Sequence, residues 1–152
     1  MINKSNLYEK DFYKWTLQTA QMLKEKSFTK IDIKHLIEEV ESMGASDYRE
    51  LRSRLIILIA HLLKWEYQPK ERSSGWIGTI EEQRIQLQGL IDQSPSLNNK
   101  AISCLENNTN YMKSLNIASR ETMIPKKAFP QELPYSLSEI LDDDFFPEAK
   151  NY

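Results

Sequence analysis

The chain has 152 residues, of which 40% are hydrophobic and 28% charged, a composition typical of globular proteins. Its 4 glycines and 6 prolines are few for a turn-rich β-protein, whereas its many leucine, lysine and glutamate residues favour helices. The formal net charge of −2 lacks the basic surplus of a typical nucleic-acid binder. These values exclude wholesale disorder and favour an all-α protein.

Apolar residues at three- and four-residue spacing predict five main helices. In chain order they cover about residues 5–26, 32–43, 46–67, 76–94 and 95–123. Asp32 is the predicted N-cap of the second helix and Gly44 its stop, so helices two and three are expected to lie antiparallel. We then expect ion pairs between these two helices, such as Glu41 with Arg49.

The centre of the predicted helix 46–67 is apolar around nearly its whole circumference, which places it in the middle of the fold. After residue 123, three prolines predict an extended segment, and Ser136 with Glu139 forms a capping-box pair that opens a short last helix. We therefore expect one domain over 1–152, an antiparallel helical bundle with its core at about 5–123. Residues 124–152 form a wrap, a short helix and an acidic tail.

The single cysteine, Cys104, lies in an apolar helical pattern and is predicted to be a small buried residue. No continuous apolar stretch opens the chain as a signal peptide would. The most hydrophobic run, Leu55–Leu63, is far shorter than the roughly 20 residues that cross a bilayer. The sequence thus predicts a cytoplasmic protein with no membrane partner.

Two candidate catalytic residues lie on the predicted central helix. Arg54 and His61 are two helical turns apart on one face, so an imidazole that titrates near neutral pH and a phosphate-binding guanidinium share that face. This spacing resembles the Arg…His motif of HEPN-type ribonucleases, although Leu55 stands where that family has a polar residue. The alternative, which we favour, is a buried histidine that is hydrogen-bonded for structural reasons.

Aromatic and cationic residues gather after this helix. Trp65, Arg72 and Trp76, with Arg84 further on, have the composition of a stacking or phosphate-contacting surface, although nearby glutamates offset the charge. Tryptophans that fill the core are the favoured interpretation. On the second helix, His35 with Glu38 or Glu39 has a spacing that two metal ligands can share. Asp11 would supply a third metal ligand. The favoured interpretation is that these are solvated charged side chains, and no metal or cofactor is predicted.

Five segments occur in the order of a known family: YEKDFYKWTLQTAQML, IKHLIEEVESMGASDYRELRSRLIILIAHLLKWEYQP, RSSGWIGTIEEQR, DQSPSL and FPQELPYSLSEILDDDFFP. They resemble the mostly cyanobacterial "domain of unknown function 29" family over about Tyr8 to Pro147. The resemblance implies an all-helical fold and no established activity. It also implies that a site would draw on the polar residues that match the family pattern, namely Asp11, Glu39, His61, Arg72 and Arg84.

The sequence favours a non-enzymatic helical module that binds another macromolecule. Protein is the favoured partner and nucleic acid the less favoured one, while a homodimer stays open. The binding residues would be Trp65, Arg72, Trp76, Arg84 and Glu39. The alternative is a metal-independent ribonuclease, or another nucleic-acid enzyme, that uses His61 and Arg54.

Overall fold

The computed structural model describes residues 4–150, and every regular element in that range is an α-helix or a short 3-10 helix. The predicted all-α fold class is confirmed. Contacts divide the chain into two compact units, with the boundary between Ser46 and Asp47. Each unit is described by itself.

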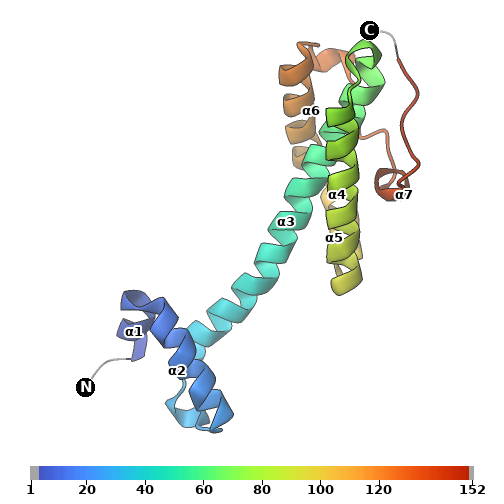
Figure 1. Cartoon of the computed structure of the whole chain (residues 1–152). Helices are drawn as coiled ribbons and strands as arrows, with labels where there is room; N and C mark the ends of the chain where they lie inside the picture. The colour runs from blue at the N-terminus through green and yellow to red at the C-terminus, as the bar shows by residue number, and fades with distance from the viewer. Residues whose placement is uncertain (1–3, 151–152) are drawn as a thin grey trace. The chain divides into compact units, whose positions relative to one another are not determined.

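The first unit contains α1 (Lys4–Lys10), α2 (Phe12–Lys24), η1 (Phe28–Lys30) and the beginning of α3 (Ile33–Tyr67). The single helix predicted over 5–26 is divided at Asp11, where α1 and α2 meet at an angle (Figure 1). The Asp11 carboxylate accepts a hydrogen bond of 3.0 Å from the Lys14 backbone N–H and so caps α2. The unit buries Trp15, and the Tyr8 ring packs edge-on against it at 4.9 Å.

The predicted turn at Gly44 is wrong. Helix α3 begins after its N-cap Asp32, as expected, and then continues through Gly44 to Tyr67. A glycine in a helix interior costs only about 1 kcal/mol relative to alanine, which the helix-favouring residues on both sides offset. Glu41 and Arg49 therefore lie on the same helix, and the predicted antiparallel pair of helices does not form.

The second unit contains the rest of α3 and six further elements: η2 (Pro69–Glu71), α4 (Ser74–Gln93), α5 (Leu97–Glu106), α6 (Asn108–Thr122), η3 (Lys126–Ala128) and α7 (Leu137–Leu141). The second half of α3 runs between α4 and α6 (Figure 1). Its leucines are buried among apolar residues of α4, α5 and α6, which confirms the central position predicted for this helix. These leucines are Leu51, Leu55, Leu58, Leu62 and Leu63.

The fifth predicted helix is two helices, α5 and α6. Asn107 divides them because its side chain accepts a hydrogen bond of 3.0 Å from the Thr109 N–H and caps α6. Asn110 donates to the Cys104 carbonyl oxygen at 3.1 Å across this break. Cys104 is buried, as predicted, and its thiol donates to the Tyr48 hydroxyl.

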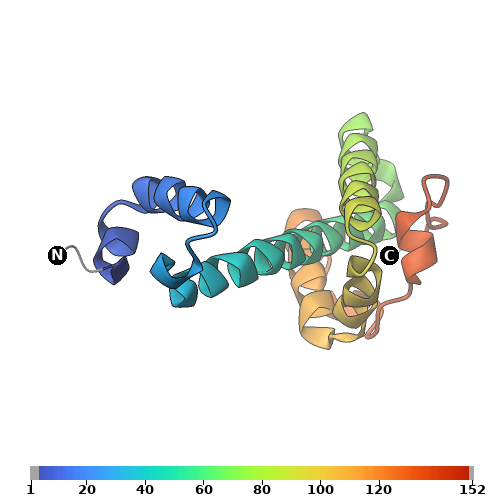
Figure 2. The same ribbon diagram turned by 90° about the horizontal axis from the view of Figure 1, so that it is seen from below.

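The C-terminal segment packs along α4, as both views show (Figures 1 and 2). Ser136 and Glu139 form the predicted capping box of α7. Arg84, with only 1% of its surface exposed, donates to the carbonyl oxygens of Ile140 and Phe145, both at 2.8 Å. Because the guanidinium is buried among these carbonyls, it holds the C-terminal segment against α4, and the binding role of Arg84 stays a prediction.

Candidate functional site

His61 and Arg54 both lie on the second half of α3, but each is engaged by other groups. His61 is partly exposed, and its Nδ1 lies 3.0 Å from the Ile57 carbonyl oxygen, so Nδ1 carries the proton. Burial lowers the pKa of His61, which keeps the imidazole neutral at pH 7. The Arg54 Nε donates to Glu50 at 2.9 Å and its Nη1 to Gln83 at 3.1 Å. A neutral imidazole and a charge-paired guanidinium fit the structural interpretation of these residues.

A buried lysine lies one turn beyond His61. Lys64 is 6% exposed and its ammonium contacts the Glu121 carboxylate at 2.7 Å. The same ammonium lies 4.6 Å from the centre of the Trp76 ring, which covers it. The hydrogen bond from Lys64 lowers the pKa of Glu121. Trp76 therefore shields an ion pair between α3 and α6.

Trp65 and Arg72 form a second cation–aromatic pair. The Arg72 guanidinium lies 4.5 Å from the centre of the Trp65 ring, and Arg72 Nε donates to the Trp65 carbonyl oxygen at 2.9 Å. The Trp65 ring also packs against Phe146, with ring centres 5.0 Å apart. Among the described residues, the Arg72 Nη2 is buried without a hydrogen-bond partner. The predicted binding role of Trp65, Arg72 and Trp76 stays a prediction.

In the first unit, Glu39 and His35 contact the aromatic cluster of α1 and α2. The Tyr8 hydroxyl donates to Glu39, which raises the pKa of Tyr8 to about 12. The Tyr8 ring stacks on His35 at 4.0 Å, and the His35 Nδ1 contacts Asp32. Among residues 4–150, no three His, Cys, Asp or Glu side chains are arranged to hold a metal ion. The proposed set of His35, Glu38 or Glu39 and Asp11 is therefore not assembled.

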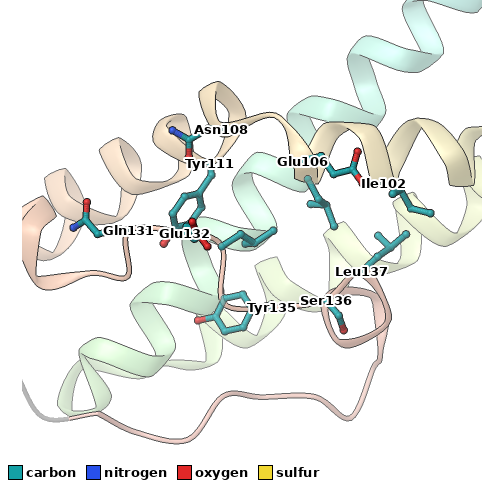
Figure 3. Close-up of a pocket in the computed structure, with 11 residues that line it drawn as sticks. Ile102, Glu106, Asn108, Tyr111, Gln131, Glu132, Tyr135, Ser136 and Leu137 are labelled. Atoms are coloured by element: carbon teal, nitrogen blue, oxygen red, sulfur yellow. The ribbon is translucent and has the colours of Figure 1, made fainter.

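The second unit contains a groove of about 730 Å³ that the sequence did not reveal. Residues of α5 and α6 line one side and the segment 131–137 lines the other (Figure 3). We call it the α5–α6 groove. Its apolar lining comes from Ile102, Leu105, Tyr111, Leu133, Tyr135 and Leu137, and its polar lining from Glu106, Asn108, Gln131, Glu132 and Ser136.

Two tyrosines hold the walls of the α5–α6 groove in place. The Tyr111 hydroxyl donates to the Pro130 carbonyl oxygen at 2.7 Å, which ties α6 to the start of the extended segment. The Tyr135 hydroxyl donates to the buried Glu66 carboxylate at 2.6 Å and ties that segment to α3. Burial raises the pKa of both tyrosines, so both hydroxyls stay protonated donors at neutral pH.

The charge of the α5–α6 groove is negative. Glu106 and Glu132 are both exposed, and no lysine or arginine belongs to the lining. Neither His61 nor Arg54 lines it. Its residues come from segments about thirty positions apart, so no local sequence motif could indicate it. The prolines of the predicted extended segment after residue 123 were the one sequence signal for this groove, because they predict an extended chain that covers a helix face.

The chain belongs to a family whose members have no assigned activity. The model of the family described as "Domain of unknown function DUF29" matches residues 7–146. This confirms the predicted resemblance, which covered nearly the same range. Neither the curated proteins nor the solved structures that were compared gave a match. Within residues 4–150, no helix has both the length and the apolar character needed to cross a membrane.

Proposed function

We propose that this protein is a binding module rather than an enzyme, and that the α5–α6 groove binds a positively charged, partly apolar segment of a partner protein. The observation that carries the proposal is the lining itself. Apolar side chains form the walls, while the only formal charges are those of Glu106 and Glu132. A ligand that buries an apolar stem and presents a cation fits both features.

An arginine or lysine side chain has this combination of properties. Its methylene groups can pack on Tyr111 and Leu133, and its charged end can reach a carboxylate of the groove. Asn108, Gln131 and Ser136 add side-chain donors and acceptors that suit the backbone of an extended peptide. The volume of 730 Å³ is in the range of pockets that enclose small ligands or a few side chains.

Nucleic acid is a poor occupant of this groove. A phosphate backbone contributes most of its affinity through lysine and arginine contacts, and the lining offers carboxylates instead. The ribonuclease alternative also draws no support from the contacts on α3, where Glu50 and Gln83 engage Arg54 and the Ile57 carbonyl engages His61. A protein segment is therefore the partner that we propose.

The groove can be tested with two randomised peptide pools that differ only in a fixed central residue, arginine in one and glutamate in the other. The arginine pool is expected to bind, with weaker binding at high salt, and the glutamate pool is not. The double variant E106Q/E132Q is expected to lose at least about fivefold in affinity, because both carboxylates become neutral. Methyl shifts of Ile102 and Leu137 in NMR spectra would locate the bound peptide.

The matched control is Glu148→Gln, an exposed acidic residue outside the groove. The Glu148→Gln variant is expected to bind the arginine pool with the same affinity as the unmodified protein. Equal binding of the two pools, or full affinity in E106Q/E132Q, would overturn the proposal.

A separate prediction concerns His61. Replacement by alanine is expected to lower the free energy of unfolding by about 1–3 kcal/mol, because a half-buried group and its hydrogen bond to Ile57 are lost. Urea denaturation measures the loss, and binding of the arginine pool should be unchanged. An unaltered stability together with loss of RNA cleavage by the purified protein would instead favour the ribonuclease alternative.

A further inference from the structure

The first part of α3 carries an apolar stripe that stays largely exposed in the described part of its unit, residues 4–46. Ile33, Ile37, Val40 and Met43 recur at spacings of four, three and three residues, so they lie on one face of the helix. Their exposed fractions are 49%, 50%, 60% and 69%. We call these four residues the α3 stripe. A continuous row of large exposed apolar side chains marks a surface that another element covers in solution.

A neighbouring face of the same helix contacts α1. Glu39 accepts a hydrogen bond from Tyr8, and His35 stacks on the Tyr8 ring at 4.0 Å. On a helix of 3.6 residues per turn, His35 points away from the stripe, whereas Glu39 lies at its edge, next to Met43. Helix α1 therefore contacts α3 through Tyr8 beside the stripe, and the four exposed side chains of the stripe are left for a different partner.

The charges beside the stripe indicate what that partner is. Lys34 and Glu41 are two turns apart, so they flank the stripe on the same side. Both are exposed, and neither takes part in an ion pair among residues 4–150. Lys34 lies near the N-terminal end of the stripe and Glu41 near its C-terminal end. This surface is therefore complementary to itself when a second helix lies antiparallel to it.

We infer that the α3 stripe pairs with the α3 stripe of a second copy of this chain, in an antiparallel arrangement about a two-fold axis near residues 37 and 38. Lys34 of each copy then meets Glu41 of the other, and Ile37 packs against Val40 of the second copy. Such an interface is isologous and closes as a dimer. It is independent of the α5–α6 groove, which lies in the second unit.

Charge reversal provides the decisive experiment. The unmodified chain is expected to sediment as a dimer, with twice the mass of one chain. K34E or E41K alone replaces two attractive contacts with two repulsive ones, and is expected to raise the dimer dissociation constant at least about fivefold. The double variant K34E/E41K recreates both pairs with their signs exchanged, and should recover the original constant within about twofold. Val40→Asp should give a monomer.

The control variants are E9K and K10E, which reverse exposed charges on α1 away from the stripe and should leave the dimer unchanged. Circular dichroism verifies that each variant is folded. Rescue in the double variant identifies a second copy, because residues 34 and 41 are too far apart to pair on one helix. A monomeric unmodified chain at about 100 µM, as expected if the stripe contacts a different partner, would overturn the inference. Equal weakening in the single and double variants would do the same.

Discussion

Replacing Arg84 with methionine is expected to lower the free energy of unfolding by about 3–5 kcal/mol. The guanidinium donates to two carbonyl oxygens at 2.8 Å and lies 5.4 Å from the centre of the Phe146 ring. A hydrogen bond to a charged group contributes about 1.5–3 kcal/mol, and its loss leaves carbonyl oxygens without donors. Methionine keeps the apolar stem, so the loss reflects the hydrogen bonds rather than a cavity.

Chemical denaturation followed by tryptophan fluorescence measures this effect. Arg84→Lys keeps the charge but cannot reach several carbonyls at once, and is expected to recover only part of the loss. The matched control, Arg49→Met, removes an exposed arginine of α3 and should change the free energy of unfolding by less than about 0.5 kcal/mol. Limited proteolysis should also cut residues 137–150 faster in the Arg84 variants. Equal stability of the two methionine variants would contradict this account of the C-terminal segment.

The second large effect is expected at Tyr135. Tyr135→Phe keeps the ring, which packs edge-on against Phe145 at 5.8 Å, but removes the hydroxyl that donates to Glu66. Glu66 is 6% exposed, and its remaining cationic partner, Lys150, lies at 3.6 Å. We expect the free energy of unfolding to fall by about 2–3 kcal/mol, because a buried carboxylate loses its closest donor.

This variant also has a pH signature. Burial, and then the hydrogen bond to Glu66, raises the pKa of Tyr135 above its ordinary value of 10.0. Above pH 10 the unfolded chain releases the phenol proton while the folded protein keeps it, so stability falls as the pH rises. The stabilisation that comes from the raised pKa of Tyr135 is fully present below pH 10. It is lost as the pH rises from 10 toward the pKa of Tyr135 in the folded protein. The stability gap between the unmodified protein and Tyr135→Phe should therefore narrow above pH 10.

Tyr111→Phe is the matched comparison, because the Tyr111 hydroxyl donates to a neutral carbonyl oxygen rather than to a carboxylate. Its expected loss is about 1 kcal/mol at neutral pH. Denaturation series from pH 8 upward measure the free energy of unfolding of the unmodified protein and the two variants. Lysines that titrate in this range affect the three proteins equally. Identical losses in the two variants, or a gap that does not change with pH, would show that the Tyr135–Glu66 contact does not stabilise the fold as described.

Local signals in the sequence predicted the helical content and several helix ends correctly. Asp32, Ser136 and Glu139 cap their helices as expected, because a capping hydrogen bond joins residues only three positions apart. The central position of α3 followed from its apolar circumference. Gly44 misled the prediction because glycine permits a helix end without requiring one. Whether the helix stops there depends on what its two halves contact.

The roles of polar residues were harder to predict. Arg84 has the same local pattern as an exposed arginine, and only the convergence of carbonyl oxygens from residues 139–145 shows that it is buried. The α5–α6 groove escaped prediction for the same reason. Its two walls are separated along the chain, and their distance in space is set by contacts such as Tyr111 with Pro130.

The sequence by itself thus determined the all-helical class, the family and the helix that forms the core, since periodicity and caps act over a few residues. The tertiary structure alone decided the continuity of α3, the burial of Arg84 and the acidic groove beside Tyr111 and Tyr135. These features depend on groups far apart in the chain, whose meeting is governed by packing of the whole second unit rather than by local propensity.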